Sequence, residues 1–169
     1  DNNLEAEYIH YNTVTKEVTT DKPFDSWNAK GDGLTGTNIV YNLGTKDFYS
    51  KENITVKNKD YGLTTKNVTY KEDTGILTAP EPYVIKSSSG DSTVNGNSIT
   101  YNKKTGELVS PGEIIVDNKG TIIKGHDLVY NNISGLGKIQ GPIPFENKAD
   151  NMSGIAKELI IKKGDYVDL

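Results

Sequence analysis

The sequence predicts a single all-β domain over residues 1–169, built from six repeats of about thirty residues each. Three observations predict this fold class. One spacing of tyrosine, aliphatic and small residues recurs along the chain, apolar residues alternate with polar ones as strands require, and no segment has helical periodicity. The apolar fraction is 34%, below the roughly 45–50% of an ordinary globular protein. Such a composition favours a thin core whose strands each keep one wet face.

The first strand of each repeat is recognised from an anchor position, and successive anchors lie 30, 29, 31, 29 and 31 residues apart. The anchors are Tyr11, Tyr41, Tyr70, Tyr101, Tyr130 and Ile161. Two positions before them stand the aliphatic residues Ile9, Ile39, Val68, Ile99, Leu128 and Leu159. Five positions before them stand the small residues Ala6, Gly36, Thr65, Gly96, Gly125 and Ala156. Seven positions before them stand Leu4, Leu34, Leu63, Val94, Ile123 and, breaking the pattern, Gly154.

A tight turn is expected directly after each anchor. Four residues beyond it lie the hydroxyl residues Thr15, Thr45, Thr74, Thr105 and Ser134. Glycine follows in three repeats, as Gly75, Gly106 and Gly135. A hydroxyl residue and a glycine between two alternating runs are typical of a hairpin in which glycine adopts the left-handed conformation.

The second strand of each repeat follows this turn. Its apolar positions are thirteen residues past the anchor (Phe24, Ile54, Tyr83, Ile114 and Ile143) and fifteen past it (Val56, Ile85, Val116 and Phe145). Both share one face, because strand side chains alternate with period two. Five prolines have the opposite parity, which suits strand starts, edges or bulges: Pro80, Pro82, Pro111, Pro142 and Pro144. The next connection is short and polar, and the longest expected loop is residues 25–33, with Trp27.

The first strand must change phase along its length, because its apolar positions seven and two before the anchor have opposite parity. A bulge at the small residue would reset the phase. We therefore expect backbone irregularities near Gly36, Gly96 and Gly125, and we expect Gly96→Val to destabilise the domain because a β-branched residue tolerates positive φ badly. Repeated bends predict a curved, twisted stack with one apolar concave interior.

The tyrosine ladder has two interpretations. The rings fill a core surface with their hydroxyls at its rim, or they line a groove for an apolar ligand together with the aliphatic columns. The low apolar content favours an interior that is not fully closed. The candidate groove residues are Ile39, Tyr41, Ile54, Val56, Val68, Tyr70, Tyr83, Ile85, Ile99, Tyr101, Ile114, Val116, Leu128 and Tyr130.

Other chemistries have little support in the sequence. The chain has no cysteine, and its nineteen basic residues are all lysine, so the arginine forks that grip phosphates and bases are missing and no nucleic acid partner is expected. His10 and His126 are expected to face outward, outside any catalytic or metal-ligand spacing. The glycine-rich residues 135–141 lie in a hairpin rather than at a helix N-terminus. Residues 30–33 carry too few acidic ligands for calcium. We expect no catalytic residues, no metal, no cofactor and no enzymatic activity.

The repeat unit resembles that of a known family. The pattern G-x-x-aliphatic-x-Tyr occurs as GTNIVY at residues 36–41, GNSITY at 96–101 and GHDLVY at 125–130. Between these units, GEIIV at 112–116 and GPIPF at 141–145 are similar to the family's second strand. In this pattern the chain resembles the OstA-like family over nearly its whole length. It departs from the family in having no arginine and in its last anchor, Ile161.

The resemblance implies an elongated, open, V-shaped β-jellyroll of about twelve antiparallel strands that holds acyl chains between two sheets. The periplasmic members LptA and LptC carry lipopolysaccharide toward the outer membrane of Gram-negative bacteria. The implied ligand is lipopolysaccharide or a similar amphiphile. The implied partners are other transport-bridge proteins or copies of the chain, joined by edge strands around residues 4–11 and 155–162. An LptC-like chain would also meet an inner-membrane transporter and be tethered by an N-terminal helix, whereas an LptA-like chain would be free in the periplasm; the residues leave this choice open.

Two rival hypotheses remain. The chain could be a secreted structural or adhesive β-solenoid with a dry core. A carbohydrate-active enzyme would instead need two of the scattered carboxylates, such as Glu5, Glu7, Asp47 and Glu52, to converge on one cleft. If the chain carries lipid, Ile99→Glu or Ile114→Glu should abolish lipid capture in a protein that still folds, because a charge would face acyl chains.

Overall fold

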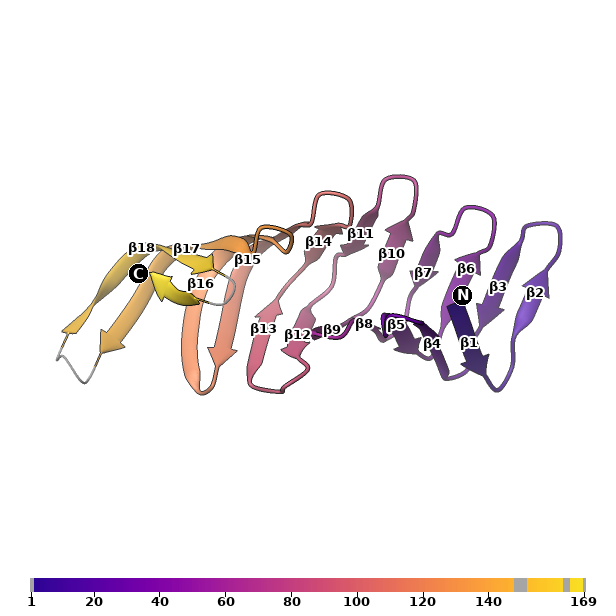
Figure 1. The fold of residues 1–169 in the computed structure, drawn as a ribbon, viewed down its shortest axis with the longest axis horizontal. Helices are drawn as coiled ribbons and strands as arrows, with labels where there is room; N and C mark the ends of the chain where they lie inside the picture. Colours follow the sequence, from indigo (N-terminus) through magenta and orange to yellow (C-terminus); the bar gives the residue numbers. More distant parts are fainter. Residues whose placement is uncertain (1, 148–151, 163–164, 169) are drawn as a thin grey trace.

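The computed structural model describes residues 2–147, 152–162 and 165–168, and its nineteen strands form one antiparallel sheet that is not closed into a barrel. Repeats one and two contain β1 (Asn2–Ala6), β2 (His10–Asn12), β3 (Glu17–Thr20), β4 (Phe24–Asn28), β5 (Gly33–Gly36), β6 (Ile39–Asn42), β7 (Phe48–Ser50) and β8 (Ile54–Lys57). Repeats three and four contain β9 (Tyr61–Thr65), β10 (Val68–Lys71), β11 (Ile76–Ala79), β12 (Tyr83–Ser87), β13 (Ser92–Gly96), β14 (Ile99–Asn102) and β15 (Glu107–Asn118). The last two repeats contain β16 (Thr121–Asn131), β17 (Leu136–Asn147), β18 (Met152–Lys162) and β19 (Asp165–Asp168). The repeats follow one another along the long axis in chain order (Figure 1).

The all-β prediction is confirmed, and the strand count differs for a simple reason. Most of the predicted strands are split into two short ones by a bend, so that the first predicted strand becomes β1 and β2, and the second becomes β3 and β4. From β15 to β18 the strands run through the bend without a break, and the ladder shifts register there instead, between Ser110 and Glu113 in β15 and between Gln140 and Ile143 in β17. Each shift places one extra residue on one strand, which is a β-bulge.

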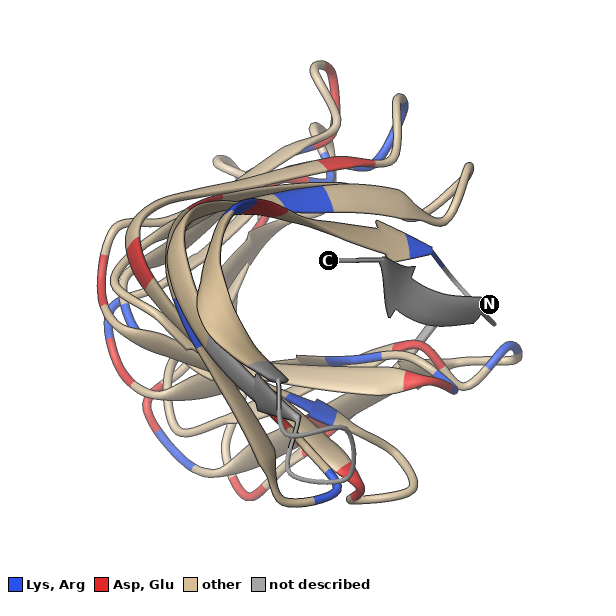
Figure 2. Ribbon diagram, turned by 90° about the vertical axis from the view of Figure 1, so that its left-hand side faces the viewer, with Lys and Arg blue, Asp and Glu red and all other residues tan. Residues whose placement is uncertain are grey.

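The bend divides the sheet into two layers. One, the tyrosine layer, contains β2, β3, β6, β7, β10, β11, β14 and the stretches of β15 to β18 that pair with them in sequence. The other, the aliphatic layer, contains β1, β4, β5, β8, β9, β12, β13 and the remaining stretches of β15 to β18. Viewed along the long axis, the two layers join on one side and are separated on the other (Figure 2).

The core lies along the bend, where the layers are closest. Its fully buried apolar residues are Phe24, Ile39, Ile54, Val68, Ala79, Tyr83, Ile99, Ile114, Leu128, Ile139, Ile143 and Leu159. Four buried polar residues lie in the same region, and they bond to backbone groups that the interrupted ladder leaves unpaired. Ser110 Oγ, for example, donates to the carbonyl oxygen of Ser98 at 2.7 Å, and Thr20 Oγ1 accepts from the backbone N–H of Lys22 at 3.0 Å.

The irregularities expected near Gly36, Gly96 and Gly125 are present, but the positive φ on which the expected cost of Gly96→Val rested is not. None of these glycines has positive φ; in the bends it is Asn67 and Asp127, two residues after the small position, that have φ values of 51° and 54°. The small residue is required by packing. A Cβ on Gly96 would lie 2.6 Å from the ring of Tyr83.

Two further expectations are settled by the strands. The predicted loop at residues 25–33 is wrong, because Asp25 to Asn28 belong to β4 and Gly33 begins β5. The polar Ser26 stands where the next four repeats have an apolar residue, which concealed the strand in the sequence. The five prolines are exposed, as their parity predicted. No helix among the described residues has the length and hydropathy needed to cross a lipid bilayer.

The two layers are not equally continuous. In the tyrosine layer β16 pairs with β17, but in the aliphatic layer no pairs join the described residues 121–125 of β16 to residues 141–147 of β17. Pro142 and Pro144 contribute to this interruption, because they remove two amide donors at alternate positions, which face the same side of a strand. This stretch of β17 still pairs with β18, so the missing amide donors lie on the side of β17 that faces β16.

Candidate functional site

The interior surface between the layers consists of two continuous rows of side chains. The tyrosine row crosses the tyrosine layer from strand to strand as Val18, Tyr41, Phe48, Tyr70, Leu77, Tyr101, Leu108, Tyr130, Gly137 and Ile161. The aliphatic row crosses the other layer as Leu4, Ser26, Leu34, Val56, Leu63, Ile85, Val94, Val116 and Ile123. Apart from Phe48 and Leu77, which are buried, these residues are half-buried. Except for Val18, their apolar side chains pack against the core at the bend, and the half-buried ones keep part of their surface accessible.

The structure places all fourteen candidate residues on the inner face, but at two depths. Seven are fully buried at the bend and belong to the core: Ile39, Ile54, Val68, Tyr83, Ile99, Ile114 and Leu128. Seven lie in the two rows and remain partly accessible: Tyr41, Val56, Tyr70, Ile85, Tyr101, Val116 and Tyr130. Only the second group presents a surface that a ligand could touch without displacing the core.

The depth difference changes one expectation. Ile99 and Ile114 are 1% and 0% exposed, so a glutamate at either position would be buried in the core instead of facing a ligand. Burying an unpaired charge costs several kcal/mol or more, which is comparable with the roughly 5–15 kcal/mol that stabilises a domain. The variants Ile99→Glu and Ile114→Glu are therefore expected to unfold, and they do not test binding.

Sequence reasoning left out half of the interior. The column seven residues before the anchor was recognised in the repeats but not assigned to the site, although Leu34, Leu63 and Val94 belong to the aliphatic row. The column seven residues after the anchor was missed altogether: Val18, Phe48, Leu77 and Leu108. The signal was present, because these four residues are apolar at the same distance from their anchors.

The turns after the anchors form a hydrogen-bonded stack along one rim. The Asn after the anchor caps each of four turns; Asn102 Oδ1, for example, accepts from the backbone N–H groups of Lys104 and Thr105. Neighbouring turns are joined, since the Lys103 N–H donates to the Gly75 carbonyl at 2.8 Å. Gly75, Gly106 and Gly135 have φ between 72° and 74°, as predicted, and Lys16 and Lys46 take the same conformation in the first two turns.

Two of the tyrosine hydroxyls, those of Tyr70 and Tyr101, are engaged at this rim. Tyr101 Oη accepts from Asn132 Nδ2 at 2.8 Å. Tyr70 Oη donates to Glu72 Oε2 at 2.5 Å, and its ring packs against Phe48 with a centroid distance of 5.4 Å. Burial, and then the Glu72 carboxylate, hold the pKa of the Tyr70 hydroxyl far above its ordinary value. The rings of Tyr70 and Tyr101 are therefore held with their apolar faces against the core and their hydroxyls at the rim.

A cluster of lysines surrounds Glu72 at this rim. Lys103 Nζ lies 3.8 Å from Glu72 Oε2 and 5.7 Å from the centroid of the Tyr70 ring. The hydrogen bond from Tyr70 lowers the pKa of Glu72, and the positive charges of Lys103, Lys46 and Lys104 lower it further. In the neighbouring turn, directly before β7, Asp47 accepts from Lys71 Nζ at 2.8 Å. We call Lys46, Glu72, Lys103 and Lys104 the rim cluster.

The two histidines lie on the outer surface, as the sequence predicted. His10 is exposed in β2, and His126 lies at the bend in β16, paired in register with Glu113 and Gln140. His126 Nδ1 lies 2.7 Å from Asp127 Oδ2, and the other Asp127 oxygen accepts from the Gly112 N–H at 2.9 Å. The hydrogen bond to Asp127 raises the pKa of His126, and the bond from Gly112 lowers the pKa of Asp127. Within the described residues, no group of three or more His, Asp and Glu side chains is placed to hold a metal ion.

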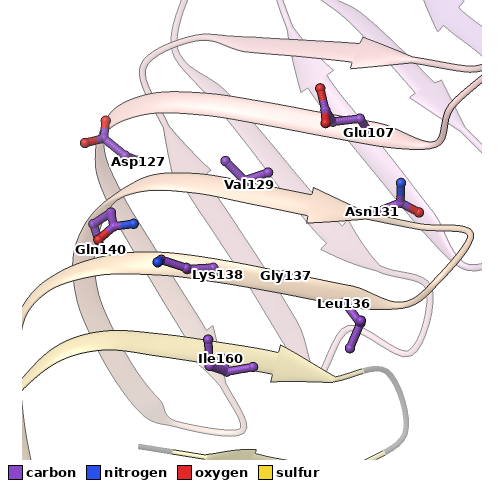
Figure 3. A pocket seen from close by; sticks show the side chains of 9 residues that line it. All are labelled: Glu107, Asp127, Val129, Asn131, Leu136, Gly137, Lys138, Gln140 and Ile160. Carbon is purple, nitrogen blue, oxygen red and sulfur yellow. The ribbon is translucent and has the colours of Figure 1, made fainter.

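One surface depression lies away from the candidate interior. It has a volume of about 590 Å³ and lies on the outer face of β15 to β18 (Figure 3). Its apolar part is formed by Val129, Leu136 and Ile160, and Lys138 beside them is paired with Glu158 at 2.5 Å. A second depression, of about 330 Å³, lies near Tyr8 and His10. Of the residues in the two rows only Gly137 lines either depression, and of the fourteen candidate residues only Ile39 does, so both depressions lie largely outside the interior.

Comparisons with known proteins add no relative: no family model matches the chain, and no curated protein matches it.

Proposed function

We propose that this domain binds the apolar chains of an amphiphile between its two layers and releases the molecule without changing it chemically. The observation that carries the proposal is the pair of half-buried rows, which line an interior left open on one side. The aliphatic row runs over nine strands, and eight spacings of about 4.8 Å make it about 38 Å long. Each methylene moved from water to such a surface contributes about 0.8 kcal/mol. An acyl chain would thus be held without any catalytic group.

The specific ligand that we propose is lipopolysaccharide or a similar amphiphile. This choice rests on the OstA-like pattern of the repeats, in which the fold is an open β-jellyroll and the ligand passes through the periplasm. In this function the chain would act beside other transport-bridge proteins or copies of itself, free in the periplasm or tethered to the inner membrane. The aliphatic residues would contact the acyl chains, and the tyrosine hydroxyls would remain at the rim.

Edge strands support the part of the proposal that concerns partners. Among the described residues, β1 and β2 each pair with a strand on one side only. At the other end, β18 pairs along its length with β17, and β19 pairs with the stretch of β18 that contains Ile160 and Lys162. The edge available at this end is therefore the earlier part of β18, where Ile155 is exposed. An unpaired edge accepts a further strand through backbone hydrogen bonds.

A structural stalk is the second candidate function, and one observation favours it. The turns are joined in a ladder by backbone bonds such as Leu43 N–H to Lys16 oxygen and Asn132 N–H to Gly106 oxygen, at 2.8 and 2.9 Å. Such stacking stiffens the long axis of the molecule, which a stalk requires. A stalk has no need for partly accessible apolar rows, so binding of an apolar chain separates the two functions.

Photo-crosslinking tests the proposed function directly. A photoreactive amino acid at Tyr101 or Val116 faces the interior, and the same amino acid at Thr100 or Ile115 occupies the adjacent position of opposite parity. With labelled lipopolysaccharide and with a labelled single-chain lipid, we expect adducts from the interior positions and few from the controls. Equal labelling at all four positions, or no labelling of a folded protein, would contradict the proposal and favour the stalk.

A charge introduced into the aliphatic row provides an independent measurement. Ile85 is half-buried in this row, whereas Val84 beside it points away from the interior. We expect Ile85→Glu to weaken lipid binding at least tenfold, because a carboxylate would face the acyl chain, while circular dichroism shows a folded sheet. Val84→Glu is the matched control and should bind as the unchanged protein does. If both variants bind alike, the aliphatic row is not the binding surface.

A further inference from the structure

The rim cluster differs from the other turns because it places a positive charge at the border of the interior. Lys103 belongs to the turn after Tyr101, and its Nζ lies 5.7 Å from the centre of the Tyr70 ring. Tyr70 is a member of the tyrosine row, so the ammonium group stands where the apolar interior meets solvent. Among the described residues this is the one contact between a lysine and an aromatic ring. The Lys103 side chain is 63% exposed and accessible to a ligand.

Glu72 acts as an internal counter-ion for this lysine. Its carboxylate accepts a hydrogen bond from Tyr70 Oη at 2.5 Å and lies 3.8 Å from Lys103 Nζ, a distance at which the ion pair is loose. An exposed pair at such a distance contributes roughly 0–1 kcal/mol. An external anion could therefore exchange for Glu72 at Lys103 at little cost.

Two more lysines lie close enough to add to the local positive charge. Lys46 and Lys104 both act electrostatically on Glu72, and Lys104 Nζ donates to the backbone carbonyl of Asp73, which leaves its charge unneutralised by that bond. The neighbouring Lys71 is neutralised by Asp47 at 2.8 Å and does not contribute. With Lys71 and Asp47 counted, four lysines face the three carboxylates of Asp47, Glu72 and Asp73, and one positive charge is left over at the mouth of the interior.

We propose that the rim cluster binds the anionic headgroup, a phosphate or a carboxylate, of the amphiphile whose chains lie between the layers. This inference rests on the proposed function and adds a headgroup preference to it. The tyrosine row fixes the direction of the ligand: its polar end lies at the rim of residues 102–106 and its apolar end lies against the aliphatic row. Lys103 supplies the main contact, Lys46 and Lys104 supply the surrounding field, and Glu72 competes with the ligand.

Two amphiphiles with one chain length test the inference on the complete chain. Monododecyl phosphate carries an anionic headgroup and dodecyl maltoside an uncharged one, and both are titrated below their micelle concentrations by calorimetry. We expect Lys103→Gln to weaken binding of dodecyl phosphate about fivefold, the factor that one ion pair at about 4 Å supplies in water. Binding of dodecyl maltoside should not change. Lys59→Gln, on a turn at the opposite rim, is the control and should leave both unchanged.

Replacement of Glu72, which competes with the ligand for Lys103, should change the affinity for dodecyl phosphate in the opposite direction. Glu72→Gln keeps an acceptor for the Tyr70 hydroxyl but removes the negative charge, so dodecyl phosphate should bind about fivefold more tightly. A purely structural role of the ion pair would weaken binding of both amphiphiles in both variants. Equal affinities of the two amphiphiles, or no effect of Lys103→Gln and Glu72→Gln, would overturn the headgroup site while leaving the interior as a binding surface.

Titration with inorganic phosphate alone shows whether the rim cluster binds free anions or the headgroup of an amphiphile. If it binds the unchanged protein as tightly as dodecyl phosphate does, the cluster is a site for free anions and the headgroup assignment is wrong. If it binds at least a hundredfold more weakly, the apolar chain contributes to binding, as the assignment requires. Failure of both amphiphiles to bind a folded protein would contradict the proposed function itself, and the headgroup site with it.

Discussion

Replacement of Gly96 by alanine tests whether close packing at the bend, rather than backbone conformation, fixes the small residue of each repeat. A Cβ at this position would lie 2.6 Å from one ring carbon of Tyr83 and 2.7 Å from its hydroxyl oxygen. Tyr83 is 2% exposed, so its ring has no free space into which to retreat. Overpacking of this kind costs about 1–3 kcal/mol.

The matched control is Gly62→Ala in β9. A Cβ there would meet its nearest atom, Cγ2 of Thr55, at 3.6 Å, which is ordinary contact. Alanine in a strand interior is favoured over glycine by about 0.5–1 kcal/mol, so this control should be slightly stabilised. In a protein of this size 1 kcal/mol corresponds to about 2–4 °C in Tm. Gly96→Ala should therefore melt several degrees below the unchanged protein, and Gly62→Ala at or slightly above it.

Thermal and urea unfolding measure both variants, and a double-mutant cycle assigns the cause. In a Tyr83→Leu background the ring is gone, so the cost of Gly96→Ala should fall by at least 1 kcal/mol. If Gly96→Ala is as stable as Gly62→Ala, or if its cost is unchanged in the Tyr83→Leu background, the packing explanation is wrong.

The remaining predictions concern depth in the interior and pH. Ile114→Ala, at a fully buried position, should lower the free energy of unfolding in urea by about 2–5 kcal/mol. Val116→Ala, in the accessible row, should lower it clearly less. Equal losses would contradict the conclusion that Ile114 and Val116 lie at different depths. The hydrogen bond to Asp127 raises the pKa of His126 above its ordinary 6.5. The hydrogen bond from the Gly112 backbone, and then the one with His126, lower the pKa of Asp127 below its ordinary 3.8. The stabilisation by this pair should be fullest between pH 3.8 and 6.5, fading as pH rises through the raised His126 pKa or falls through the lowered Asp127 pKa. In Asp127→Asn, NMR titration should show the His126 pKa shifted down toward 6.5; an unchanged value would refute the pairing.

Periodicity made the strands and the inner face predictable. Local patterns fix these features, since alternation with period two decides which side chains share a face. Ile39, Ile99 and Tyr101 were predicted to face one interior, and they do so because each repeat keeps the same register. The hairpin glycines were predictable for a related reason, because a left-handed residue is a local requirement of the turn.

The first repeat shows where local patterns fail. Ile9 and Tyr11 occupy the same columns as Ile39 and Tyr41, yet they are 41% and 45% exposed. Tyr11 lies in the terminal strand β2 and Ile9 directly before it. This strand has a neighbour on one side only among the described residues, so the surface that buries the other columns is incomplete there. Burial depends on neighbours that a single repeat does not specify.

What the sequence by itself determined is the repeat, most of the strands, their inner face and the position of the bend in the first strand of each repeat. The tertiary structure decided the depth of each inner residue, because depth depends on how closely the two layers approach. Near the bend they meet, and Ile114 is fully buried; two residues farther along, where they diverge, Val116 keeps accessible surface. The tertiary structure also brings Tyr83 against Gly96, which leaves no room for a side chain there, and places Lys103 over the Tyr70 ring. Both contacts join segments from different strands and turns. Such contacts leave no spacing in the sequence, because they are set by the distance between the layers and by the stacking of one turn on the next.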